Sequence, residues 1–136
     1  MSSLIRLLDK RVLFFGGKGG VGKTTSASAM ALAASRAGRR VLLVSTDPAH
    51  STADIFERAI GPEPVQLLPN LHGLEIDGDF EAKRYVKDVK ERIKGLFGHN
   101  IQKEANKQID LAASMPGAEE MALFDRIGGL VRGEDD

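Results

Sequence analysis

The sequence predicts an α/β domain with a mostly parallel sheet and flanking helices, followed by the start of an all-helical part. One observation is a strand–helix–strand pattern, in which apolar runs at residues 11–15 and 40–45 flank a helical segment of small residues. The other is a change after residue 77, where apolar residues begin to recur at spacings of three and four. We therefore expect two domains, residues 1–78 and 79–136.

Composition limits the kinds of site that the chain can hold. Its 136 residues include 19 basic and 19 acidic residues and no cysteine. Because the charges cancel, no global field would hold nucleic acid or an anionic membrane, so an anion site must be local. The lack of cysteine excludes disulfides, thiolate metal ligands and cysteine nucleophiles. No apolar stretch is long enough to span a membrane, and charges interrupt the N-terminal segment, so we expect a cytoplasmic protein without a nucleic-acid partner.

A glycine-rich loop lies between the first two of three predicted elements. Residues 11–15 (RVLFF) form a continuous apolar run, which predicts a buried parallel strand. Residues 23–37 are rich in alanine with helical spacing, and Gly38 is a favourable residue to end that helix. Residues 40–45 (RVLLVS) predict a second buried strand. Together these elements predict a right-handed βαβ unit.

The remaining elements change in character along the chain. Residues 51–60 predict a short helix, prolines at 62 and 64 mark a loop, and residues 71–76 predict a third strand. Three amphipathic helices follow, and from spacing alone their apolar faces are expected to pack on the sheet or on each other. Those faces comprise Phe80, Val86, Val89, Ile93 and Phe97, then Ile101, Ala105, Ile109 and Ala112, then Met121, Phe124, Ile127 and Val131.

The loop at residues 17–24 (GKGGVGKT) fits the phosphate-binding pattern G-x-x-x-x-G-K-[ST]. Its glycines let backbone N–H groups turn towards a phosphate, and the helix start adds free donors and a positive dipole end. Lys23 would reach the β- and γ-phosphates and Thr24 would offer its hydroxyl to Mg²⁺. A plain glycine-rich turn is disfavoured, because a random chain matches the pattern roughly once in two hundred. The predicted nucleotide-binding residues are Gly17, Lys18, Gly19, Gly20, Val21, Gly22, Lys23, Thr24 and Thr25.

Lys18 has no role in that pattern. Its long stem could reach a nucleotide held by a second copy of the chain, or it could be a solvated loop lysine, and position alone leaves both open. However, the string K-G-G-x-G-K-T resembles the deviant Walker A motif of dimeric P-loop ATPases, which include chromosome-partitioning, division-site-placement, nitrogenase iron-protein and arsenite-pump groups. The resemblance implies that Lys18 acts across a dimer interface and Lys23 within its own subunit.

Asp47 is the candidate catalytic carboxylate. It follows the second predicted strand, where open α/β sheets place ligand groups, and Pro48 restricts it to an extended conformation. Such a carboxylate could orient a water or lie in the outer shell of Mg²⁺, although Asp-Pro alone is also a common turn. The string S-T-D-P-A-H resembles switch I of the arsenite-pump and tail-anchored-protein targeting ATPase family. The resemblance implies that Asp47 positions the attacking water, and His50 falls on the family's histidine.

Two further stretches resemble the same family. LHGLEID resembles its L-x-x-x-E-I-D-P stretch, with Gly78 in place of the proline, and PGAEE resembles its P-G-x-x-E segment. The resemblance therefore runs along nearly the whole chain. The family's next strand and its D-T-A-P-T-G-H switch II have no counterpart here, so we expect the N-terminal portion of a longer protein, with weak or no ATP hydrolysis alone.

The function implied by the resemblance is a Mg-ATP-driven ATPase. It would be a homodimer joined through the nucleotide face and coupled to metalloid or membrane-protein cargo. In targeting members of this family, the helical part builds an apolar groove for the membrane-protein client. Two alternatives stay open. One is a partitioning or positioning ATPase that binds DNA or membrane, and the other is a non-hydrolysing nucleotide-binding fragment or adaptor.

Overall fold

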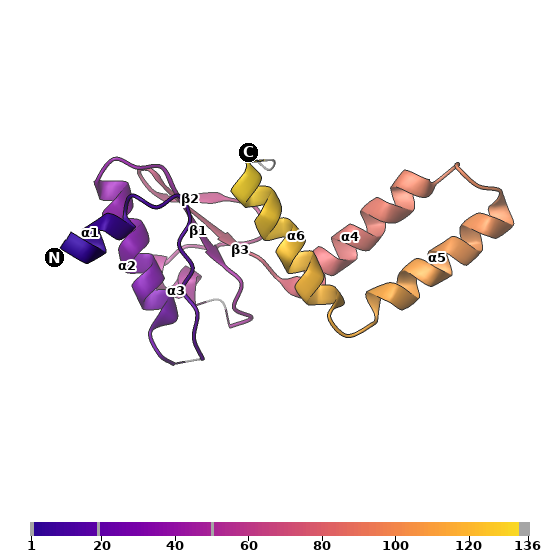
Figure 1. The fold of residues 1–136 in the computed structure, drawn as a ribbon, viewed down its shortest axis with the longest axis horizontal. Helices are drawn as coiled ribbons and strands as arrows, with labels where there is room; N and C mark the ends of the chain where they lie inside the picture. Colours follow the sequence, from indigo (N-terminus) through magenta and orange to yellow (C-terminus); the bar gives the residue numbers. More distant parts are fainter. Residues whose placement is uncertain (1, 19, 50, 134–136) are drawn as a thin grey trace. The chain divides into compact units, whose positions relative to one another are not determined.

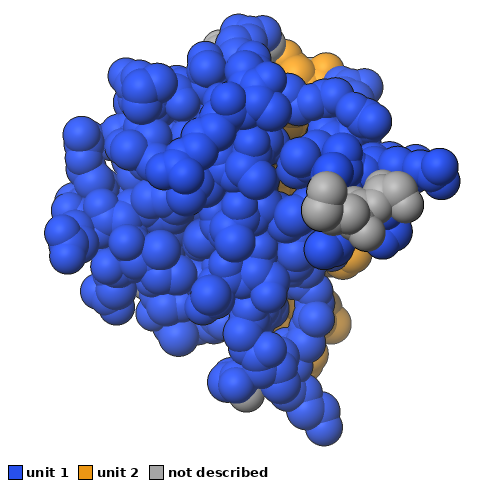
Figure 2. All heavy atoms as spheres, turned by 90° about the vertical axis from the view of Figure 1, so that its left-hand side faces the viewer, with its two compact units in different colours: residues 1–76 blue, residues 77–136 orange. Residues whose placement is uncertain are grey.

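A computed structural model describes residues 2–18, 20–49 and 51–133. The chain divides into two compact units, Met1–Ile76 and Asp77–Asp136, which Figure 2 distinguishes by colour. Gly19, His50 and residues 134–136 lie outside the described residues. Along the chain, unit 1 contains α1 (Ser2–Leu7), α2 (Lys23–Arg36), β1 (Val41–Ser45), α3 (Thr52–Phe56), β2 (Val65–Leu68) and β3 (Leu71–Glu75). Unit 2 contains α4 (Gly78–Ile93), α5 (His99–Ala113) and α6 (Ala118–Arg132) (Figure 1).

The sheet of unit 1 has the strand order β1-β3-β2. β1 and β3 run parallel, in a register from Val41 opposite Leu71 to Ser45 opposite Glu75. β2 is antiparallel to β3 because only two residues separate them, and Asn70 takes a left-handed φ of 66° there. The α/β class is thus confirmed with a small mixed sheet, and β2 is a strand that the sequence pattern did not predict.

A small core joins α2 to this sheet. Ala31 of α2, Leu67 of β2 and Leu71 of β3 form a buried cluster. Leu74, also in β3, is fully buried as well. The buried face of α2 consists of small side chains, including Ser28, which allows the helix to approach the strands closely. This packing fixes the helix that follows the glycine-rich loop.

The prediction of a strand at residues 11–15 is wrong. Within the described residues this segment is extended chain that leads from α1 to the loop (Figure 1), and Phe14 is 78% exposed rather than buried. An apolar run supplies strand propensity, but a strand also needs a neighbour that completes its hydrogen-bond ladder. The sheet β1-β3-β2 does not include this segment.

Unit 2 consists of the three predicted amphipathic helices, except that α4 ends at Ile93, so Phe97, which was expected on its apolar face, lies in the following turn. α4 packs against both α5 and α6. The Asp77 side chain accepts a hydrogen bond from the Phe80 amide at 3.2 Å and so caps α4. At Gly78 a Cβ atom would lie 3.2 Å from Cβ of Glu119, so α4 and α6 approach each other closely at this glycine.

Candidate functional site

The glycine-rich loop has the backbone geometry that only glycine adopts easily. Gly20 and Gly22 have φ angles of 81° and 85°, in the left-handed region where a side chain is strained. A Cβ atom at Gly17 would lie 2.8 Å from Cγ2 of Val21. The loop therefore favours glycine at Gly20 and Gly22 because of their backbone conformation, and at Gly17 because of the short contact with Val21.

The loop leads directly into α2, whose first residue is Lys23. Gly22 is the residue before the helix and has no side chain that could accept from the N–H groups of the first turn. Those amides, together with the positive end of the helix dipole, provide the donors that an anion such as a phosphate requires. This end of α2 thus fits a phosphate.

Lys23 connects the loop to the segment after β1. Its Nζ donates to the carbonyl oxygen of Gly17 at 3.4 Å and forms an ion pair with Oδ2 of Asp47 at 3.0 Å. The two charged side chains are 25% and 27% exposed, respectively, so the pair is accessible to solvent and to a ligand. The structure therefore brings together the two residues to which the sequence assigns phosphate binding and water positioning.

Asp47 is oriented by its own turn. Its Oδ1 accepts a hydrogen bond from the Ala49 amide at 2.9 Å, as in an Asx turn, while Oδ2 faces Lys23. Nearby, Oγ of Ser51 donates to Oγ1 of Thr24 at 3.0 Å. The sequence assigned no contact to Ser51, and no local signal could have found it, because this bond joins the first turn of α2 to the residue before α3, which only the fold brings together.

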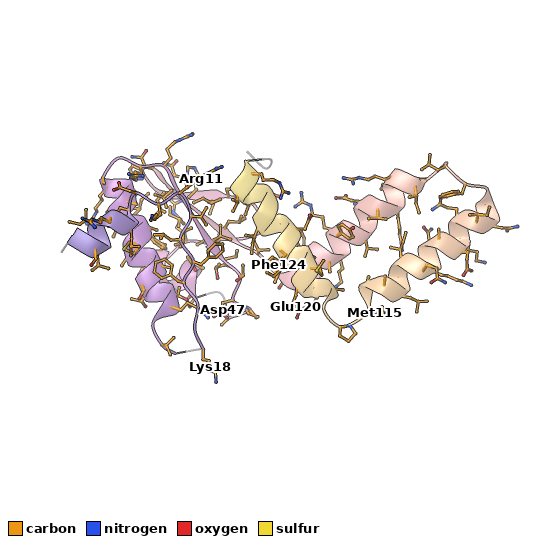
Figure 3. The ribbon with its side chains drawn as sticks, in the orientation of Figure 1. Arg11, Lys18, Asp47, Met115, Glu120 and Phe124 are labelled. Carbon is orange, nitrogen blue, oxygen red and sulfur yellow. The ribbon has the colours of Figure 1, made fainter. Side chains whose placement is uncertain are left out.

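The other predicted residues lie apart from this contact. Lys18 is exposed, and in Figure 3 its side chain extends outward from the loop. Val21 and Thr25 are also exposed. Gly19 lies outside the described residues.

The available oxygen ligands suit one kind of metal site. Among the residues that the structure describes, no group of three or more His, Cys, Asp or Glu side chains could hold a metal ion. Mg²⁺ differs from Zn²⁺ in that it keeps several waters and binds through one or two protein groups plus substrate phosphates. The Thr24 hydroxyl and the Asp47 carboxylate fit this requirement. Within the described ranges, no helix combines the length and the apolar character needed to cross a bilayer.

Comparison with known proteins assigns the chain to a family. A family model described as "Anion-transporting ATPase" matches residues 10–135. The chain belongs to this ATPase family. It is 41% identical over 121 residues to an arsenical pump-driving ATPase of Acidiphilium multivorum, a match that covers 88% of this chain and 20% of the relative.

Other relatives agree with this assignment. A protein of Escherichia coli named arsenical pump-driving ATPase is 39% identical over 88% of this chain and 20% of its own length. A Paramecium tetraurelia protein named ATPase ASNA1 homolog 1 is 37% identical over 82% of this chain and 33% of its own length. The chain thus spans a fifth to a third of these relatives, and the resemblance to the arsenite-pump and targeting ATPases is confirmed.

Proposed function

We propose that this chain is the nucleotide-binding part of a Mg-ATP-driven ATPase of the arsenical pump-driving type. The observation that supports the proposal most directly is the 3.0 Å contact between Lys23 and Asp47, the residues to which we assign phosphate binding and water positioning. On this proposal, residues 1–78 belong to the nucleotide-binding core and residues 79–136 begin a helical subdomain. The family match over residues 10–135 supports the assignment to an ATPase.

Each site residue has a distinct role in the proposed reaction. Lys23 and the amides at the start of α2 bind the phosphates and offset their charge. Thr24 would hold Mg²⁺ directly and Asp47 would hold it through water; when bound, the ion would supply positive charge that offsets the charge developing on the phosphates. Asp47 also orients the attacking water, and its turn with Ala49 restricts the directions in which the carboxylate can point.

Lys18 extends the proposal to a dimer. Its exposed side chain is free to reach across to the nucleotide of a second copy, and we propose a homodimer joined through this face. The names of the relatives favour metalloid cargo over a membrane-protein client. These 136 residues contain no cysteine, so they supply no thiolate ligand for a metalloid, but this composition suits a reducing compartment such as the cytoplasm.

Nucleotide titration tests the proposal. We expect the purified chain to bind a fluorescent ATP analogue, more tightly with Mg²⁺, and Lys23→Ala to weaken binding at least about tenfold, because a charge-assisted hydrogen bond to phosphate is lost. Lys10→Ala removes an exposed lysine of the same unit and should change the affinity little. The proposal is wrong if the wild-type chain does not bind, or if Lys23→Ala and Lys10→Ala bind equally well.

A further inference from the structure

Both phosphate-site side chains are already engaged by the segment that follows β1. Lys23 is held by Asp47, and the Thr24 hydroxyl accepts from Ser51. The ammonium of Lys23 has three donors, of which one faces the Gly17 carbonyl oxygen and another the Asp47 carboxylate. The carboxylate thus sits on Lys23 as a phosphate oxygen would, at the distance of a charge-assisted hydrogen bond.

We propose that Asp47 and Ser51 form a latch that competes with nucleotide for Lys23 and Thr24. The proposal rests on the function proposed above. A carboxylate and a polyphosphate repel each other when both approach one ammonium, so Lys23 exchanges Asp47 for the ligand rather than holding both. Nucleotide binding therefore releases Asp47 from Lys23 when the carboxylate is needed to orient the attacking water.

The latch is confined between two fixed points. On one side, β1 ends at Ser45, which is held in register with Glu75 of β3. On the other, Thr52 begins α3 and is only 2% exposed, so it anchors the chain directly after Ser51. A change at Asp47 and Ser51 therefore needs no rearrangement of the sheet or of α3.

The exposure of the pair indicates that the latch is weak. Ion pairs that remain open to solvent contribute little free energy, because water and salt screen them. A strong latch would abolish binding, whereas a weak one reduces affinity modestly. We expect its removal to tighten nucleotide binding about two- to fivefold.

Amine labelling tests the latch without nucleotide. In the full 136-residue chain, Lys23 should be acylated slowly relative to Lys10, because its ammonium must leave Asp47 and Gly17 before the amine can react. Asp47→Asn retains the shape and the turn with Ala49 but removes the charge, and should raise labelling of Lys23 about two- to fivefold. Asp54→Asn, in the adjacent helix α3, is the matched control for loss of one negative charge and should leave Lys23 labelling unchanged.

Nucleotide titration of the same variants completes the test. Asp47→Asn should bind Mg-free ADP about two- to fivefold more tightly than either wild type or Asp54→Asn. The latch is refuted if Lys23 labelling does not respond to Asp47→Asn, or if wild type binds ADP and Asp47→Asn binds no more tightly than Asp54→Asn. If neither wild type nor the variants bind ADP, the proposed function is wrong, and so is the idea that nucleotide displaces Asp47 from Lys23. That result differs from failure of the latch alone, in which wild type still binds ADP. Circular dichroism establishes that each variant is folded.

Discussion

Unit 1 and unit 2 each contain an ion pair between segments that are far apart in the sequence, and the pairs differ in exposure. In unit 1, Lys23 and Asp47 are 25% and 27% exposed at a separation of 3.0 Å. In unit 2, Arg126 of α6 and Glu81 of α4 are only 9% and 7% exposed, at 3.7 Å. The exposed pair can exchange one partner for a ligand at little cost, whereas the buried pair cannot separate without leaving a charge inside the protein. On our proposal, the exposed pair serves ligand binding and the buried pair supports the fold.

The largest expected effect comes from breaking the buried pair. Arg126→Met should lower the free energy of unfolding of unit 2 by about 3 kcal/mol, because Glu81 keeps its charge while losing a cation. Urea unfolding followed by the helical circular dichroism signal measures this change. Nucleotide affinity, measured below the unfolding transition, should be unchanged.

A double variant serves as the control for this prediction. Glu81→Leu together with Arg126→Met removes both charges, and should recover most of the stability lost in Arg126→Met. If Arg126→Met instead leaves stability intact and weakens nucleotide binding, the division of roles between the two ion pairs is wrong.

The accuracy of sequence prediction also differed between the units. The helices of unit 2 were predicted closely, because an amphipathic period is a local property of the chain. In unit 1, residues 11–15 were assigned to a strand on apolar character alone, and β2 was missed because VQLL is short and follows two prolines. A strand depends on partner strands elsewhere in the chain, and a local sequence pattern does not show whether such partners are present.

The candidate site shows the same limit. The pattern G-x-x-x-x-G-K-[ST] located Lys23 and Thr24, and the position after a strand located Asp47. Their mutual contact follows from the parallel pairing of β1 and β3 and from α2 packing on the sheet. The predicted βαβ unit did not foresee this arrangement, because its first strand, residues 11–15, does not join the sheet. The Ser51–Thr24 hydrogen bond was not predictable, because a hydroxyl has no sequence context that fixes its partner.

A smaller effect is expected from the loop backbone. Gly20→Ala places a side chain at φ 81°, which costs about 1 kcal/mol and should weaken nucleotide binding about fivefold if the loop must keep this conformation. Gly16→Ala is the matched control, since Gly16 has no left-handed φ and a Cβ there would meet nothing within 4 Å. Titration with the fluorescent ATP analogue compares the two. Equal affinities would show that the left-handed turn is not required for binding.

The smallest expected effect concerns a second ion pair in unit 2, which can be compared with Arg126–Glu81. Lys90 of α4 pairs with Asp110 of α5 at 2.7 Å, which is shorter than the Arg126–Glu81 separation, but the two side chains are 32% and 62% exposed. If separation decided the strength of an ion pair, Lys90→Met would be the more damaging variant. If burial decides, it should cost less than about 1 kcal/mol, because the remaining carboxylate stays hydrated, and the cost should shrink further in high salt. Urea unfolding of Lys90→Met and Arg126→Met at low and high salt distinguishes these cases, since only the exposed pair should show a cost that salt removes.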